Sequence, residues 1–142
     1  MKRTATILTS SLLALTFVAC ATADRDSIKA LELQNSATQR MAWERKDASL
    51  LANAADRAAI QQEMNATQSV KALSVDVVSI DVTGNEAVAV TNQKLVRQTA
   101  EGEKVSTYQQ KQRYAKVGGK WQATGAAEAV AHAGTSQQPA SK

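Results

Sequence analysis

Cysteine and histidine are almost absent from this chain of 142 residues, which contains one of each, Cys20 and His132. One cysteine cannot form an intramolecular disulfide or a thiolate metal site. One histidine cannot form a metal-binding cluster, and His132 lies in a stretch of Ala, Gly, Ser, Gln and Pro that resembles a tail. That position argues against a histidine general base or a Ser–His–Asp triad. The sequence therefore predicts no metal, no cofactor and no catalytic residue of these kinds.

Charge is not concentrated anywhere, although 17 basic and 13 acidic residues give a net charge of +4. The basic residues are scattered, with no run of Lys or Arg and no aromatic residues interleaved on a basic face. Nucleic-acid binding requires such a patch, so we expect no nucleic-acid partner. A phosphate-binding loop is missing as well, because Gly118-Gly119 is too short and precedes an expected strand.

A long hydrophobic run is also missing, since the most apolar stretch, Leu12 to Val18, is too short to cross a bilayer. It follows Lys2 and Arg3 and lies in an uncharged segment that ends in small residues at Ala23. A basic start, a short apolar centre and a small-residue end are typical of a secretion signal. We therefore expect residues 1–23 to be an export signal.

The only cysteine falls where such signals are cut. Phe17-Val18-Ala19-Cys20 resembles the lipobox of bacterial lipoproteins, with Phe17 in place of the usual leucine. In that family the cysteine is lipidated and tethers the protein to a membrane. Ala21 after the cysteine implies, by resemblance, a periplasmic protein held at the outer membrane of a Gram-negative cell. The alternative is ordinary cleavage after Ala23, which would discard Cys20 with the signal.

The remaining length allows one small domain, which we place at residues 24–128, followed by a disordered tail at 129–142. No proline or glycine occurs between Asp24 and Val82, and the first part of that stretch has the three- and four-residue apolar spacing of helices. Asp47 is a good N-cap for a second helix. A third, short helix that begins near Asp56 and one continuous helix both fit the sequence.

Alternating apolar and polar residues from Val70 to Ala127 predict four strands in an antiparallel meander. The alternation changes phase at Val77-Val78, which indicates either a β-bulge or a strand buried on both faces. Asp76 and Asp81 flank this point, and we expect both on the wet face because carboxylates are rarely buried unpaired. Three glycine-marked turns separate the strands, at Gly84-Asn85, Ala100 to Glu103 and Gly118-Gly119.

Aromatic residues make up 4% of the chain, and much of the apolar content is alanine, so we expect a thin core. The aromatic set of the domain is interpreted first as filling this core, and alternatively as lining a groove for a hydrophobic small molecule, with tyrosine hydroxyls as polar handles. Its members are Trp43, Tyr108, Tyr114 and Trp121. The two tyrosines have even spacing on one strand, which places both rings on one face.

Three segments together resemble the nuclear transport factor 2-like proteins, the SnoaL-like and ketosteroid isomerase-like group. They are Trp43–Leu51, between the first and second helices, Gly84–Val90, in a hairpin, and Gly118–Gln122, where a tryptophan opens the last strand. The resemblance covers most of residues 26–128 in order. It implies an α+β fold in which a curved antiparallel sheet wraps around helices to form a cone with an apolar pocket, often in a dimer.

The chain departs from that family between the second and third helices. Family members usually carry a strand hairpin there, for which residues 53–60 leave no room, so we expect a shallow or absent pocket. The isomerase and cyclase members use a Tyr–Asp or His–Asp set that has no clear match here. The resemblance therefore implies the fold and leaves the activity open.

Two functions fit these observations. The favoured one is an exported, non-catalytic module that binds a small ligand or another protein, with a homodimer through the sheet as one expected partner. The alternative is a small isomerase- or cyclase-like enzyme that uses a buried carboxylate and a tyrosine. The enzyme requires an enclosed cavity with a titratable group, whereas the module requires only an exposed apolar or aromatic patch. A solvent-shielded carboxylate beside Tyr108 or Tyr114 would favour the enzyme.

Overall fold

The computed structural model describes residues 12–51, 54 and 56–139, with the backbone alone at 12–20 and 131–139. The start of the expected export signal, with Lys2 and Arg3, lies outside this part of the chain. The elements follow one another as α1 (Leu12–Arg45), η1 (Ala48–Leu50), α2 (Arg57–Ala66), β1 (Thr67–Thr83), β2 (Glu86–Thr99), β3 (Gly102–Val117) and β4 (Lys120–Pro139).

Helix α1 begins earlier than the domain predicted from the sequence and runs without a break through Cys20 and Ala23. It ends in a Schellman motif, because Lys46 adopts a left-handed conformation with φ of 55°. The Lys46 amide then donates to the Trp43 carbonyl and the Asp47 amide to the Ala42 carbonyl. These two bonds satisfy carbonyls that the helix end would otherwise leave unpaired.

Two aspartates start the next helical segments. The Asp47 carboxylate accepts the Ser49 amide at 3.0 Å, which confirms the predicted cap, although the segment it caps is the three-residue 3-10 turn η1. The Asp56 carboxylate accepts the Ala59 amide at 3.0 Å and caps α2. A separate third helix beginning at Asp56 is therefore confirmed, and the continuous helix is wrong.

The four strands form one antiparallel sheet in the order β1-β2-β3-β4, which confirms the predicted meander. The turns at Gly84-Asn85, Ala100-Glu101 and Gly118-Gly119 join successive strands. In the last turn both glycines have positive φ, 57° and 79°, a backbone conformation that other residues adopt at a cost.

The phase change in β1 is a β-bulge. Val77 pairs with Thr91 and Ser79 with Val90, so Val78 has no partner across the β1–β2 pair and is exposed. The alternative of a strand buried on both faces is therefore wrong. Asp76 and Asp81 are both exposed, as predicted for the wet face of the sheet.

The predicted disordered tail at 129–142 is replaced over most of its length by strand. Strand β4 continues to Pro139 and pairs with the first half of β3, with Gly102 opposite Pro139 and Tyr108 opposite His132. A composition of small polar residues suggested a tail, but strand pairing uses backbone groups that every residue except proline supplies. The folded domain accordingly extends to Pro139, and of the predicted tail only residues 140–142 lie outside the described residues.

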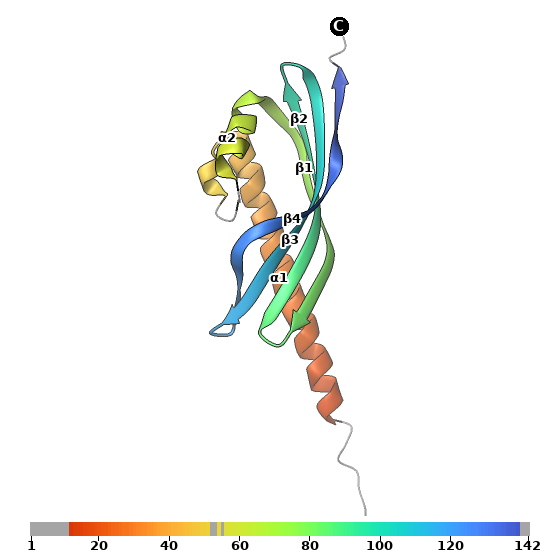
Figure 1. The fold of residues 1–142 in the computed structure, drawn as a ribbon. Coiled ribbons are helices and arrows are strands. Elements are labelled where there is room, and N and C mark those ends of the chain that lie inside the picture. The colour runs from red at the N-terminus through yellow and green to blue at the C-terminus, as the bar shows by residue number, and fades with distance from the viewer. Residues whose placement is uncertain (1–11, 52–53, 55, 140–142) are drawn as a thin grey trace, which may run out of the picture.

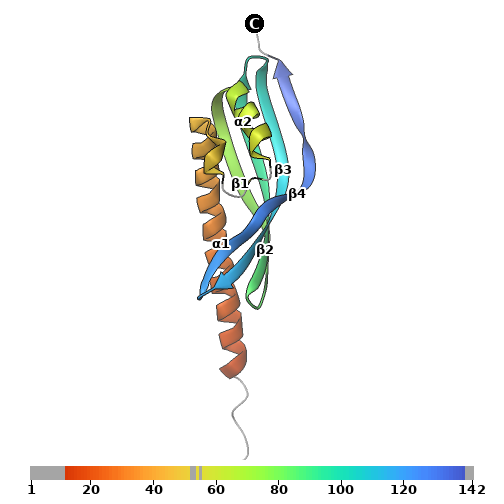
Figure 2. The ribbon, with the colours of Figure 1, turned by 60° about the vertical axis from the view of Figure 1, so that its left-hand side comes forward.

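Both long helices cover the same face of a strongly twisted sheet, with α2 beside the upper half of the strands (Figures 1 and 2). Helix α1 crosses the sheet obliquely, and its first turns project beyond the lower end (Figure 1). This arrangement is the predicted α+β fold, with N-terminal helices packed on a curved four-stranded antiparallel sheet.

The buried apolar side chains form two clusters between the helices and the sheet. We name the first the lower cluster; it contains Ile28, Ala87, Ala89, Tyr114 and Trp121. The second, the upper cluster, contains Ala42, Trp43, Ala48, Met64 and Leu95. Each cluster holds three larger side chains and two alanines, so the core is thin, as the composition predicts.

Candidate functional site

Polar side chains separate the two apolar clusters. Alternate residues of β2 face the helices, and this row changes from the alanines of the lower cluster to Thr91 and Gln93 before it returns to Leu95. Gln112, on the neighbouring strand β3, and Glu32, on α1, are also buried. A layer of buried polar groups in the middle of so small a core is costly unless each group has a partner.

A cavity of about 490 Å³ opens at this layer. Its polar part is formed by Glu32, Asn35, Thr91, Gln110 and Gln112, and its apolar part by Trp43, Leu50, Leu51, Ile60 and Leu95. From Glu32 to Trp43 the helix rises by roughly 16 Å, at about 1.5 Å per residue. The lining of this groove therefore extends along α1 from the polar layer to the upper cluster, where Asp56 and Glu63 also line it, and the expectation of an absent pocket is wrong.

Glu32 is the buried carboxyl group of this cavity. The Tyr114 hydroxyl donates a hydrogen bond of 2.7 Å to Glu32 Oε1, and the glutamate is 6% exposed. Burial raises the pKa of the Glu32 carboxyl, against a smaller lowering effect of the tyrosine hydrogen bond. Burial, and then the bond to Glu32, raises the pKa of Tyr114, which keeps its hydroxyl protonated as the donor.

The amide side chains of the layer fix one another. Gln93 Nε2 donates to Gln110 Oε1 at 2.7 Å, while Gln93 Oε1 is buried without a hydrogen-bond partner. Gln112 Nε2 donates to the Arg113 carbonyl at 3.0 Å. Of these three amides, Gln110 and Gln112 line the groove, while Gln93 lies buried in the same layer.

The structure separates the four aromatic residues singled out from the sequence. Trp43 and Tyr108 line the groove. Tyr114 and Trp121 belong to the lower cluster, and Tyr114 reaches the groove only through its hydrogen bond to Glu32. Burial raises the pKa of Tyr108, which stays a neutral hydroxyl at the groove wall.

The sequence interpretation missed Glu32, although a helical signal for it exists. Positions 28, 32, 35, 39 and 42 follow four- and three-residue steps, so Glu32 lies on the same helix face as Ile28 and Ala42, both fully buried. A glutamate in the middle of such a stripe is a candidate buried carboxyl group. Met41, an apolar residue of the same helix, is exposed.

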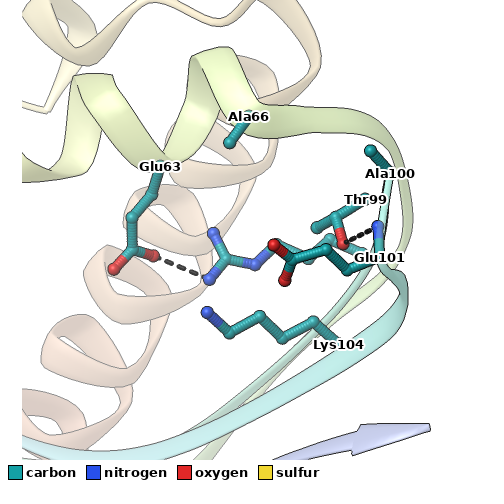
Figure 3. Close-up of a pocket in the computed structure, with 7 residues that line it drawn as sticks. Glu63, Ala66, Thr99, Ala100, Glu101 and Lys104 are labelled. Atoms are coloured by element: carbon teal, nitrogen blue, oxygen red, sulfur yellow. Dashed lines mark hydrogen bonds and ion pairs between the residues drawn. The ribbon is translucent and has the colours of Figure 1, made fainter. Parts of the chain in front are cut away.

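A second, smaller pocket of about 160 Å³ lies where α2 meets the β2–β3 turn. Figure 3 shows Glu63, Glu101 and Lys104 around it, with Ala66 and Ala100 on its walls. The Arg97 guanidinium, whose side chain is 3% exposed, pairs with the Glu63 carboxylate at 2.8 Å. The same guanidinium lies 5.2 Å from the centroid of the Trp43 ring. This cation–π contact helps to hold Trp43, which forms part of the wall of the larger groove.

No helix in the described part of the chain is long and apolar enough to span a membrane. Within that part, no group of three or more His, Cys, Asp or Glu residues is placed to hold a metal ion.

No protein-family model and no curated protein matches the sequence. Among solved structures, the chain is similar to a substituted form of Rv3472, a protein of unknown function from Mycobacterium tuberculosis. The two share 18% sequence identity over 75% of each chain, with a TM-score of 0.44. This likeness is too low to support a statement about family or function.

Proposed function

We propose that the folded domain binds a small molecule with an apolar body and a polar end in the groove between the helices and the sheet. The observation that carries this proposal is the groove itself, whose volume of about 490 Å³ falls within the range of small-molecule sites. Its lining matches such a molecule, because apolar side chains of the upper cluster and polar side chains of the buried layer both contribute to it.

Binding of the neutral fluorescent probe N-phenyl-1-naphthylamine tests this proposal. We expect its fluorescence to rise on mixing with the protein and the rise to be lost in Ser106→Trp, since Ser106 lines the groove and a larger side chain would fill it. Ser74→Trp, on an exposed position of β1, is the matched control and should bind as the natural protein does. Equal binding by both variants would place the probe elsewhere and reject the groove.

We further propose a distant relationship to the nuclear transport factor 2-like proteins. It is supported by helices packed on a meander sheet with a cavity between the two layers. The missing hairpin between η1 and α2 is the main difference. A long β4 closes part of the space instead, since Ala127 and Ala129 line the groove.

A second candidate function is proton transfer, and Glu32 is the observation that favours it. A shielded carboxyl group in hydrogen-bond contact with Tyr114 lines the groove, which is the feature that distinguishes an enzyme of this type from a module. With a raised pKa, Glu32 could take a proton from carbon next to a carbonyl group and return it to the resulting enolate. Exchange of such protons in D₂O, followed by NMR, should then be catalysed by the protein and abolished in Glu32→Gln.

We also propose export to the periplasm and a lipid tether on Cys20 at the outer membrane. Support comes from the start of the folded domain: Asp24 Oδ1 accepts hydrogen bonds from Lys116 Nζ at 2.7 Å and Trp121 Nε1 at 2.9 Å. Cleavage before Cys20 therefore leaves the contacts of Asp24 with the sheet intact, as does the alternative cleavage after Ala23. The mass of the mature N-terminus tests the tether, since acyl mass on Cys20 supports it and a chain that begins at Asp24 rejects it. A homodimer through the sheet remains a prediction, which the molar mass from light scattering checks.

A further inference from the structure

The charged side chains that line the groove are all acidic, although the Arg97 guanidinium pairs with one of them, Glu63. Three carboxyl groups line it, from Glu32 on α1 and from Asp56 and Glu63 on α2. Among the described residues that line the groove there is no lysine, arginine or histidine. The chain as a whole carries a net charge of +4, so the acidic lining does not follow from the composition.

Two of these three carboxyl groups already have partners within the protein. Glu63 pairs with Arg97 at 2.8 Å. Asp56 caps α2, where its carboxylate accepts the Ala59 amide and faces the positive end of the helix dipole. The fold alone therefore accounts for the presence of these two carboxyl groups at the groove.

Glu32 differs from the other two. It is the most buried of the three, and no ion pair to it occurs among the described residues, its hydrogen-bond partner being the neutral Tyr114 hydroxyl. A buried carboxylate without a counter-charge is unfavourable, and an ammonium group beside it would supply the missing charge in surroundings where water screens little. A carboxylate ligand would instead meet a buried group of its own sign at Glu32.

We propose that the molecule bound in the groove is a small organic amine in its protonated form, with the ammonium group at Glu32 and the apolar body against Leu51, Ile60 and Leu95. This inference rests on the proposed function and adds the chemical class of the ligand. The polar neighbours Asn35, Thr91 and Gln112 offer oxygen acceptors for the remaining N–H groups.

Three probes of one skeleton test the charge of the ligand: 2-phenylethylamine, 2-phenylethanol and phenylacetate, titrated into the full chain by calorimetry. We expect the amine to bind about tenfold more tightly than the alcohol, and phenylacetate to bind more weakly than both. In Glu32→Gln, which keeps the size of the side chain, the amine should lose this advantage and bind about as tightly as the alcohol. Glu44→Gln, an exposed position on the same helix with the same charge change, should keep it.

The outcomes separate this inference from the proposal on which it rests. If the alcohol or phenylacetate binds as tightly as the amine, or if Glu32→Gln leaves the amine preference unchanged, the amine assignment is wrong. Binding of N-phenyl-1-naphthylamine that Ser106→Trp removes would still support the groove in that case. If neither that probe nor the three phenylethyl compounds bind, both proposals fail together.

Discussion

Tyr114 and Glu32 are 82 residues apart in sequence and meet in the interior through one 2.7 Å hydrogen bond. The bond joins β3 to α1 at the boundary between the lower cluster and the polar layer. Both the packing of α1 on the sheet and the chemistry of the groove therefore depend on these two side chains.

Removal of the tyrosine hydroxyl should destabilise the fold. In Tyr114→Phe the buried Glu32 carboxyl loses its donor, and we expect a loss of about 1–3 kcal/mol in the free energy of unfolding. Tyr108→Phe is the matched control and should lose less, because the Tyr108 hydroxyl forms no hydrogen bond to the described side chains of α1. Urea denaturation of the two variants measures the difference, and equal losses would contradict a special role for the Tyr114 bond.

Glu32 should make stability depend on pH. Its pKa in the folded chain is raised above the ordinary value of 4.5, so folding disfavours the ionised form. Its contribution is therefore most favourable below about pH 4.5 and is lost as the pH rises through the folded-state pKa. Compared with the natural protein, Glu32→Gln should gain stability at about pH 8 relative to about pH 4.

Urea denaturation at both pH values checks this expectation. Glu44→Gln serves as the control, because Glu44 is exposed and forms a surface pair with Arg40. If Glu32→Gln and Glu44→Gln change the pH dependence equally, then Glu32 is ionised in the folded chain without a penalty.

Neutralising the carboxylate partner of Arg97 should destabilise the fold. In Glu63→Gln the guanidinium stays buried beside Trp43 with a weaker partner, and we expect a loss of about 1–3 kcal/mol. The exposed pair of Lys71 and Glu103, at 2.7 Å, provides the comparison, and Glu103→Gln should cost less than about 1 kcal/mol. Thermal unfolding of both variants measures the two losses. A Glu63→Gln variant no less stable than Glu103→Gln would show that Arg97 needs no carboxylate.

Asp24 should hold the start of the packed part of α1. Asp24→Ala removes the acceptor of both Lys116 and Trp121, so amide hydrogens in the turns around Arg25 to Ile28 should exchange faster. Asp26→Ala changes the same charge two residues later at an exposed position and should leave their exchange unchanged. Hydrogen exchange measured by mass spectrometry distinguishes the two variants. If these amides stay protected in Asp24→Ala, the hydrogen bonds of Asp24 do not hold this part of α1.

Local sequence signals predicted most of the sheet, whereas the start of α1 at Leu12 was not predicted. The phase change at Val77-Val78 was visible in the sequence, which left a bulge and a strand buried on both faces equally open until the strand pairing decided for the bulge. The glycine turns and the cap at Asp47 were predicted because each depends on the backbone of a few neighbouring residues, while the helix at Asp56 was one of two alternatives.

The features that the sequence did not predict depend on partners far along the chain. Residues 129–139 form a strand because β3 offers them an edge, which their own composition does not reveal. Glu32 is buried because Tyr114 reaches it from β3. The groove is lined by residues of both helices and of strands β2, β3 and β4. The lack of the hairpin that the family carries between its second and third helices therefore did not indicate how large the groove is.

The hydrogen bonds that hold Asp24 to the sheet also limit how far the domain could lie from a membrane. Only Ala21, Thr22 and Ala23 separate Cys20 from Asp24, and these residues are helical. At about 1.5 Å per residue, four helical steps span roughly 6 Å. An acyl chain on Cys20 would therefore bring the end of the sheet that carries Lys116 close to the lipid headgroups, with little freedom to reorient.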